Sequence, residues 1–93
     1  NPAAKDSFRE EARREAFARE QAWLQAGYFI VAVRAAGLAA GPMGGFDRAG
    51  VDADLLAGTP LRSFCVVNIG RPGPDAWKER LPRLARTEVV TTL

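Results

Sequence analysis

The sequence predicts an α+β fold made of a long buried helix, a short helix, a central strand and an extended C-terminal segment. A nearly continuous apolar run over residues 22–40 predicts the long helix, and a shorter apolar run over 64–67 predicts the strand. Three glycines and one proline lie between them in Gly41–Asp47, and such a composition cannot continue a helix. We therefore expect a tight loop there, with backbone N–H groups free of neighbouring side chains.

The first helical segment has its own start signal. Ser7 and Glu10 have the spacing of a capping box, with Asp6 as an alternative cap, and a polar helix rich in Glu and Arg is expected to about residue 20. The sequence leaves open whether this helix continues into the apolar run or breaks near Gln21. Gly37 is expected to end the long helix as a C-cap glycine.

Apolar side chains surround the long helix on all sides between Trp23 and Val33. Such a helix must be covered on most sides, and this short chain offers few elements to cover it. We therefore expect the fold to be incomplete without upstream residues or a partner subunit. A membrane span is a distant second interpretation, because Gln25 and Arg34 interrupt the run.

After the glycine-rich loop, Asp47 is the expected N-cap of a short helix over residues 48–56. A strand buried on both faces is expected within residues 62–69, followed by a turn at 70–74. One helical turn is expected over 75–79 and an extended segment over 80–84. Residues 87–93 suit either an edge strand or a short helix.

Composition removes several classes of function. The net charge of +2 is too small to indicate a nucleic-acid-binding protein, and the absence of histidine removes the commonest general base and most zinc sites. The single cysteine, Cys65, is expected to be a core thiol and indicates a reducing compartment such as the cytoplasm. Asp52 and Asp54 are not expected to form a metal site or an acid–base pair, because their spacing directs them to different faces.

Two segments could hold a ligand. The loop Gly41–Gly45 could offer backbone donors just before a helix N-terminus, although the residues alone favour a simple connection between elements. Arg80 and Arg83, with Lys78 nearby, could form a fork for a phosphate, although a solvated basic segment is the simpler interpretation.

A series of short motifs follows one order along the chain: Leu24–Tyr28, Ala35–Leu38, Gly41–Asp47, Val67–Gly70 and Arg80–Leu84. With these motifs the chain resembles the C-terminal half of the FMN-dependent nitroreductase family, and most closely the branch of malonic semialdehyde reductase, over about residues 16–90. On this resemblance, residues 1–93 are the C-terminal portion of a single nitroreductase-like domain.

The resemblance implies an α+β sandwich in an intertwined homodimer, with FMN at the subunit interface. Carried over by motif, the amides of Gly44 and Gly45 would donate to the flavin ring, and Pro42 and Met43 would pack against it. Two C-terminal arginines would contact the FMN phosphate; these are Arg80 and Arg83. No catalytic side chain is implied, because the flavin carries hydride from NAD(P)H to a small-molecule acceptor such as a nitro compound, quinone or aldehyde.

The family's N-terminal half, which holds the rest of the FMN site, has no counterpart in this sequence. We therefore expect the isolated segment to be inactive and to bind FMN weakly. The alternative is a non-catalytic, degenerate domain that keeps the dimerisation helix and has lost the cofactor site. A weaker alternative is a helical adaptor that binds an amphipathic partner through Trp23–Val33.

Overall fold

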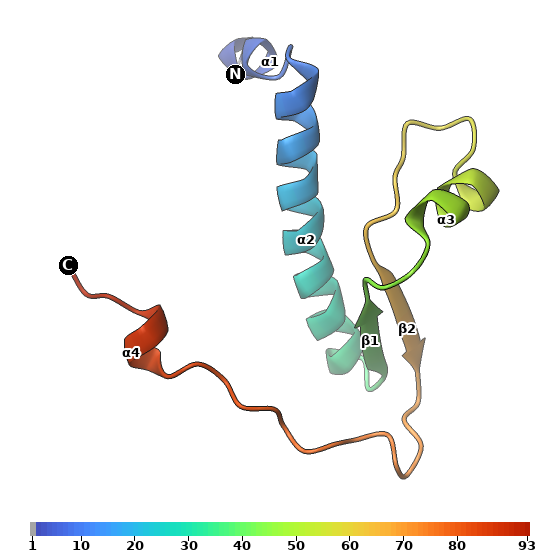
Figure 1. Cartoon of the computed structure of the whole chain (residues 1–93), viewed down its shortest axis with the longest axis vertical. Helices are drawn as coiled ribbons and strands as arrows, with labels where there is room; N and C mark the ends of the chain where they lie inside the picture. Colours follow the sequence, from blue (N-terminus) through green and yellow to red (C-terminus); the bar gives the residue numbers. More distant parts are fainter. Residues whose placement is uncertain (1) are drawn as a thin grey trace.

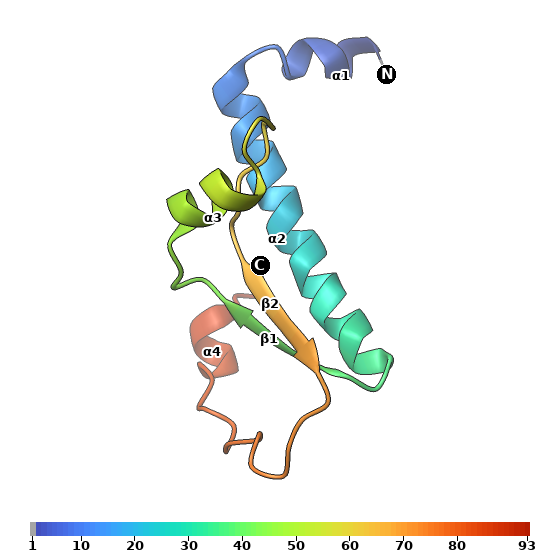
Figure 2. The same cartoon turned by 90° about the vertical axis from the view of Figure 1, so that its right-hand side faces the viewer.

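One long helix, α2, lies beside a two-stranded antiparallel sheet, and these elements position the rest of the chain (Figure 1). The computed structural model describes residues 2–93. Figure 2 shows α2 running along the strands, and its contacts are with β1. The elements are α1 (Pro2–Ser7), α2 (Glu11–Ala35), β1 (Ala39–Met43), α3 (Arg48–Leu55), β2 (Val66–Gly70) and α4 (Arg86–Val89).

The helix α2 begins later than the capping pattern predicts. Ser7 is the last residue of α1, and α2 starts after Glu10, which makes no side-chain cap. The turn between the helices is held instead by Arg14, whose Nη1 donates to the carbonyl oxygens of Phe8 at 2.8 Å and Arg9 at 2.7 Å. These two bonds satisfy carbonyls that the break leaves without helical partners.

From Glu11 the helix is unbroken for 25 residues. Of the two alternatives that the sequence left open, a break near Gln21 and a continuous helix, the structure has the continuous helix. At a rise of about 1.5 Å per residue it is about 37 Å long. Its end is as predicted: Gly37 has φ of +86°. Gly37 N donates to Arg34 O at 3.0 Å and Leu38 N donates to Val33 O at 3.1 Å, the bonds of a Schellman motif.

The predicted loop over Gly41–Gly45 is wrong for its first three residues, which belong to β1. Gly41 lies opposite Asn68, Pro42 opposite Val67 and Met43 opposite Val66. Pairing with a distant segment overrides the poor strand propensity of glycine and proline, and a two-stranded sheet has the free edge at which proline is tolerated. The loop that remains comprises residues 44–47.

The second strand, β2, covers Val66–Gly70 and starts later than predicted. It is half-buried at its start and exposed from Asn68 onward, so the prediction of a strand buried on both faces does not hold within this chain. Residues 71–85 contain no helix or strand, and the helical turn expected over 75–79 is only a turn closed by Ala76 N donating to Gly73 O at 3.2 Å.

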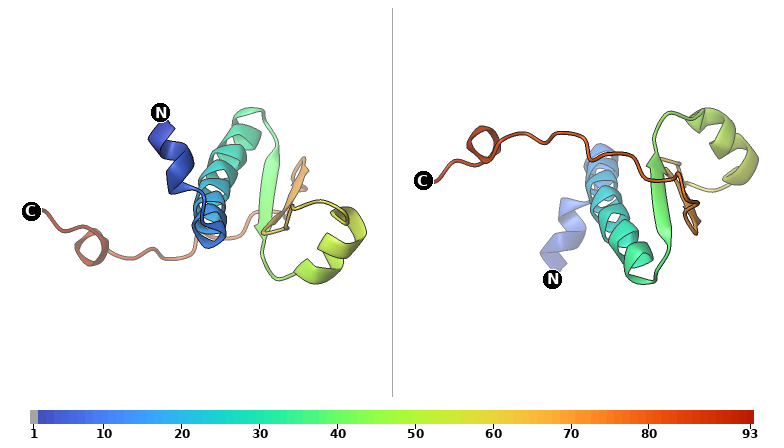
Figure 3. Two further views of the ribbon diagram at one scale, coloured as in Figure 1. Left: turned by 90° about the horizontal axis from the view of Figure 1, so that it is seen from above. Right: turned by 90° about the horizontal axis from the view of Figure 1, so that it is seen from below.

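The C-terminal segment leaves the sheet and crosses to the other side of α2 (Figure 3). The Trp77 ring lies 4.8 Å from the Arg34 guanidinium and attaches the start of this segment to α2. The segment ends in α4, which settles the choice between strand and helix in favour of a short helix. Ala85 N donates to Glu88 Oε2 at 2.9 Å at its start.

Very little of this chain is buried against itself. Among the described residues, Val33 is the only buried hydrophobic residue, and even it retains 8% of its accessible surface. The radius of gyration is 18.0 Å, against about 12 Å for a compact domain of this length. The accessible surface is 8511 Å², against about 5,200 Å² for a compact monomer of 10.0 kDa. The helix predicted to be buried therefore lacks its cover within these 93 residues.

Candidate functional site

The connection between β1 and α3 is short and held at both ends. On one side, Met43 is paired with Val66 in the sheet. On the other, the Asp47 carboxylate caps α3 by accepting from Gly50 N at 3.1 Å, as the sequence predicts. Gly44 and Gly45 lie between these anchors, so their backbone is positioned by the sheet and the helix together.

Neither Gly44 nor Gly45 is explained by the packing of the chain itself. Both lie outside the positive-φ region, where only Gly37 and Gly58 are found among the described residues. A Cβ built on either one meets nothing within 4 Å. Backbone strain and internal contacts therefore do not require glycine here, and the open space beside both residues leaves their backbone accessible to a group from outside this chain.

The two predicted ring-packing residues precede this connection directly. Pro42 and Met43 are both exposed, and Met43 retains 43% of its accessible surface. They lie opposite Val67 and Val66, so each extends an apolar pair across the sheet. Since Gly41–Met43 belong to a strand, Gly44 and Gly45 are the residues of the predicted segment Gly41–Gly45 whose backbone N–H groups lie outside regular structure.

The predicted phosphate arginines, Arg80 and Arg83, are not brought to this connection within one chain. They lie in the extended segment that runs away from the sheet (Figure 1). Arg83 Nη1 donates to Leu81 O at 2.8 Å and to Pro82 O at 3.4 Å. For these two arginines to bind a phosphate near Gly44 and Gly45, a second copy of the chain or residues outside this chain would have to take part.

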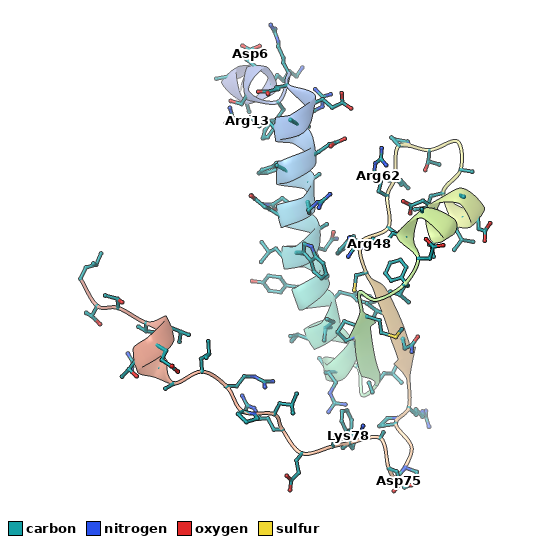
Figure 4. The ribbon with its side chains drawn as sticks, viewed as in Figure 1. Asp6, Arg13, Arg48, Arg62, Asp75 and Lys78 are labelled. Atoms are coloured by element: carbon teal, nitrogen blue, oxygen red, sulfur yellow. The ribbon has the colours of Figure 1, made fainter. Side chains whose placement is uncertain are left out.

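The sequence reasoning missed a pocket between α2 and the segment that precedes β2. Trp23 and Phe64 both line it, and their rings meet edge to face with centroids 4.9 Å apart. Three arginines surround them, Arg19 from α2, Arg48 from the start of α3 and Arg62 from the segment before β2, around a volume of about 400 Å³. We call this the arginine pocket. Figure 4 shows Arg48 and Arg62 on the side that faces α2.

A hydrogen bond holds one wall of this pocket. Asp52 Oδ1 accepts from Ser63 N at 2.7 Å, which ties α3 to the segment before β2. The hydroxyl of Ser63 and then its backbone N–H lower the pKa of Asp52 below its ordinary value of 3.8, and the charges of Arg62 and Arg48 add to this effect. The sequence reasoning treated Asp52 only as a rejected metal ligand.

This contact predicts a pH dependence of stability. A carboxyl whose folded-state pKa is lowered stabilises the fold above its unfolded pKa and loses that contribution as pH falls. We expect wild type to exceed Asp52→Asn in thermal stability at neutral pH, and the difference to shrink as pH falls below about 3.8. Melting curves of both proteins across this range measure it; a difference that is constant with pH would contradict the assignment.

Neither a metal site nor a membrane-spanning helix is found among residues 2–93. No group of three or more His, Cys, Asp or Glu side chains in this range could hold a metal ion. Within the same range, none of the helices combines the length and the apolar character needed to cross a bilayer. Cys65 is a free, half-buried thiol whose Sγ lies 3.6 Å from Val66 O.

Comparison with curated proteins adds an independent observation. Over 95 residues the chain is 61% identical to a protein of Streptomyces coelicolor named "Putative NADH dehydrogenase/NAD(P)H nitroreductase", covering 99% of this chain and 47% of that protein. The chain is a homologue of proteins with this name. One from Streptomyces griseus is 56% identical with the same coverage, and one from Leptothrix cholodnii is 50% identical over 82 residues, covering 87% of this chain and 42% of that protein.

The chain spans about half the length of the curated relatives it matches. No family model matches it. The similarity nevertheless extends through the whole described structure, including the β1–α3 connection, the arginine pocket and the C-terminal segment, because it covers 99% of the chain.

Proposed function

We propose that this chain forms part of an FMN-dependent NAD(P)H oxidoreductase. The observation that carries the proposal is the pair Gly44–Gly45, which is held in place at both ends and open on its outer side. Homologues named NAD(P)H nitroreductase support the reaction class. The proposed acceptor is a nitro compound, a quinone or an aldehyde such as a malonic semialdehyde, and the proposed compartment is the cytoplasm.

The residues of the connection fit a flat, polar-edged cofactor. A Cβ at Gly44 or Gly45 would fill the space through which a ring edge reaches the backbone N–H groups. Pro42 and Met43 offer an apolar surface next to these donors. FMN, when bound, supplies the chemistry that takes hydride from NAD(P)H and passes it to the acceptor. The chain's own residues orient the cofactor and donate hydrogen bonds to it.

We further propose a homodimer as the active assembly. The accessible surface of one chain exceeds that of a compact protein of this mass by about 3,300 Å². This excess is more than enough for a subunit interface, which buries about 800 Å² on each partner at standard size. A second copy would also supply a route by which Arg80 and Arg83, which lie away from Gly44 and Gly45 in one chain, approach the phosphate of the cofactor.

The visible absorption spectrum of the purified full-length protein, rather than of the isolated 93-residue segment, tests the proposal before and after incubation with FMN. We expect bound flavin, bleached by NADPH or NADH under anaerobic conditions and restored by a quinone. A colourless protein that does not take up FMN would overturn the proposal and favour the alternative of a non-catalytic dimerisation domain. FMN uptake without bleaching would retain the cofactor site and reject the proposed reductant.

A further inference from the structure

The arginine pocket combines features that favour an aromatic anion. Its lining residues include three arginines and one glutamate, Glu15, so the net charge of these residues is positive. Among residues 2–93, Arg9 and Asp6 are the pair whose charged nitrogen and oxygen atoms lie within 4 Å of each other. In this range Arg19, Arg48 and Arg62 therefore form no direct ion pair. Its volume of about 400 Å³ lies within the range of small-molecule sites.

The geometry of the arginines suits a phosphate monoester. Guanidinium groups bind phosphate through paired, charge-assisted hydrogen bonds, and a monoester offers three acceptor oxygens and nearly two negative charges. Here the three arginines belong to three different elements, α2, α3 and the segment before β2, so they do not all lie on one wall of the pocket. The Arg48 guanidinium lies 6.0 Å from the centre of the Phe46 ring. The neighbouring carboxylate of Asp52 accepts a hydrogen bond from Ser63 and keeps its negative charge, so the three arginines exceed the carboxylates of Glu15 and Asp52 by one charge.

The aromatic pair supplies the second half of the recognition. Trp23 and Phe64 both line the pocket, and Trp23 retains 47% of its accessible surface. A base ring placed against such a surface gains stacking and cation–π contacts with the nearby guanidiniums. A phosphate joined to an aromatic base, as in a nucleotide, therefore matches the pocket better than inorganic phosphate does.

The pocket is also close to the proposed cofactor connection. Arg48 follows Gly45 by three residues, so their Cα atoms lie no more than about 11 Å apart. A dinucleotide whose nicotinamide reaches the flavin would extend its adenosine end away from Gly44 and Gly45, and the arginine pocket lies within that reach.

We propose that the arginine pocket binds the adenosine 2′-phosphate end of NADPH, with the phosphate held by Arg19, Arg48 and Arg62 and the adenine placed against Trp23 and Phe64. This inference rests on the proposed function and deepens it, because it selects NADPH over NADH. The 2′-phosphate is the only group by which the two reductants differ, and the pocket offers charges suited to that group.

Calorimetric titration of the purified protein with adenosine 2′,5′-bisphosphate tests the site without requiring hydride transfer. We expect binding that is at least tenfold tighter than that of adenosine 5′-monophosphate, and competition by NADPH. Arg48→Gln and Arg62→Gln should each weaken bisphosphate binding about tenfold or more while changing monophosphate binding less. Arg13→Gln, on α2 outside the pocket, is the matched control and should leave both affinities unchanged (Figure 4).

The outcomes separate this inference from the proposed function. Equal binding of the bisphosphate and the monophosphate, or unchanged binding in both pocket variants, would overturn the site even if the protein binds FMN and oxidises NADH. Bisphosphate binding without competition by NADPH would assign the pocket to a free nucleotide and overturn the selection of NADPH. Competitive binding in a protein that takes up no FMN would support the pocket and overturn the proposed flavin reaction instead. Thermal melting of each variant identifies any loss of folding.

Discussion

Replacing Gly44 or Gly45 with alanine is expected to weaken FMN binding at least tenfold without destabilising the fold. Each Cβ enters space that is empty in this chain, so no internal clash is expected. Neither residue has a positive φ, so alanine suits the backbone and reduces the entropy of the unfolded chain. A ligand edge that approaches the backbone directly would instead meet the new methyl group. It would lose its close contact and a hydrogen bond between neutral groups, worth about 1 kcal/mol.

Titration of each variant with FMN, followed by flavin fluorescence, measures this effect. Gly73→Ala is the matched control, because its Cβ also meets nothing within 4 Å and its φ is not positive, yet it lies in the C-terminal segment. Gly37→Ala provides the opposite pattern: its φ of +86° predicts a loss of about 1 kcal/mol in stability. Unchanged FMN affinity in both Gly44→Ala and Gly45→Ala would remove the main support for the cofactor site.

Replacing Tyr28 with aspartate is expected to separate the proposed homodimer. Leu24, Tyr28 and Val31 recur at helical spacing on α2 and retain 58%, 73% and 66% of their accessible surface. Three large apolar side chains on one face are expected to be covered in the assembly. A carboxylate buried there without a partner would cost several kcal/mol, which corresponds to a hundredfold or greater increase in the dimer dissociation constant.

Sedimentation velocity over a range of concentrations distinguishes monomer from dimer for this variant. Arg13→Asp places the same carboxylate on the polar part of the same helix and should leave the assembly unchanged. If Tyr28→Asp assembles as wild type does, the exposed face of α2 is not the subunit contact. Loss of FMN together with loss of the dimer would further indicate that two copies share the cofactor site.

Local signals in the sequence predict the parts of the fold that depend on neighbouring residues. The Asp47 cap and the Gly37 helix end are confirmed, because each depends on bonds between residues within five positions of one another. The strand at Gly41–Met43 was predicted as loop, because its formation depends on pairing with residues 66–68 across 22 intervening positions. Long-range pairing determines the secondary structure of such segments even where their own residues disfavour a strand.

The candidate site divides in the same way. Gly44 and Gly45 can be identified from composition, because two adjacent glycines before a helix cap are visible in the sequence. The arginine pocket cannot, since no sequence period relates Arg19 to Arg48 and Arg62. Their elements are brought together by long-range contacts, the packing of Trp23 on Phe64 and the hydrogen bond between Ser63 and Asp52. The positions of Arg80 and Arg83 relative to the cofactor depend on an assembly that a single chain does not specify.

The proline in β1 has a consequence for how the sheet can grow. Each strand of a two-stranded sheet has one free edge, and further strands can pair with a free edge through its N–H and C=O groups. Pro42 has no N–H, whereas each residue of β2 from Val66 to Gly70 has one, and alternate residues of β2 direct theirs away from β1. We therefore expect additional strands to be added beside β2, with β1 forming the outer boundary of the completed sheet.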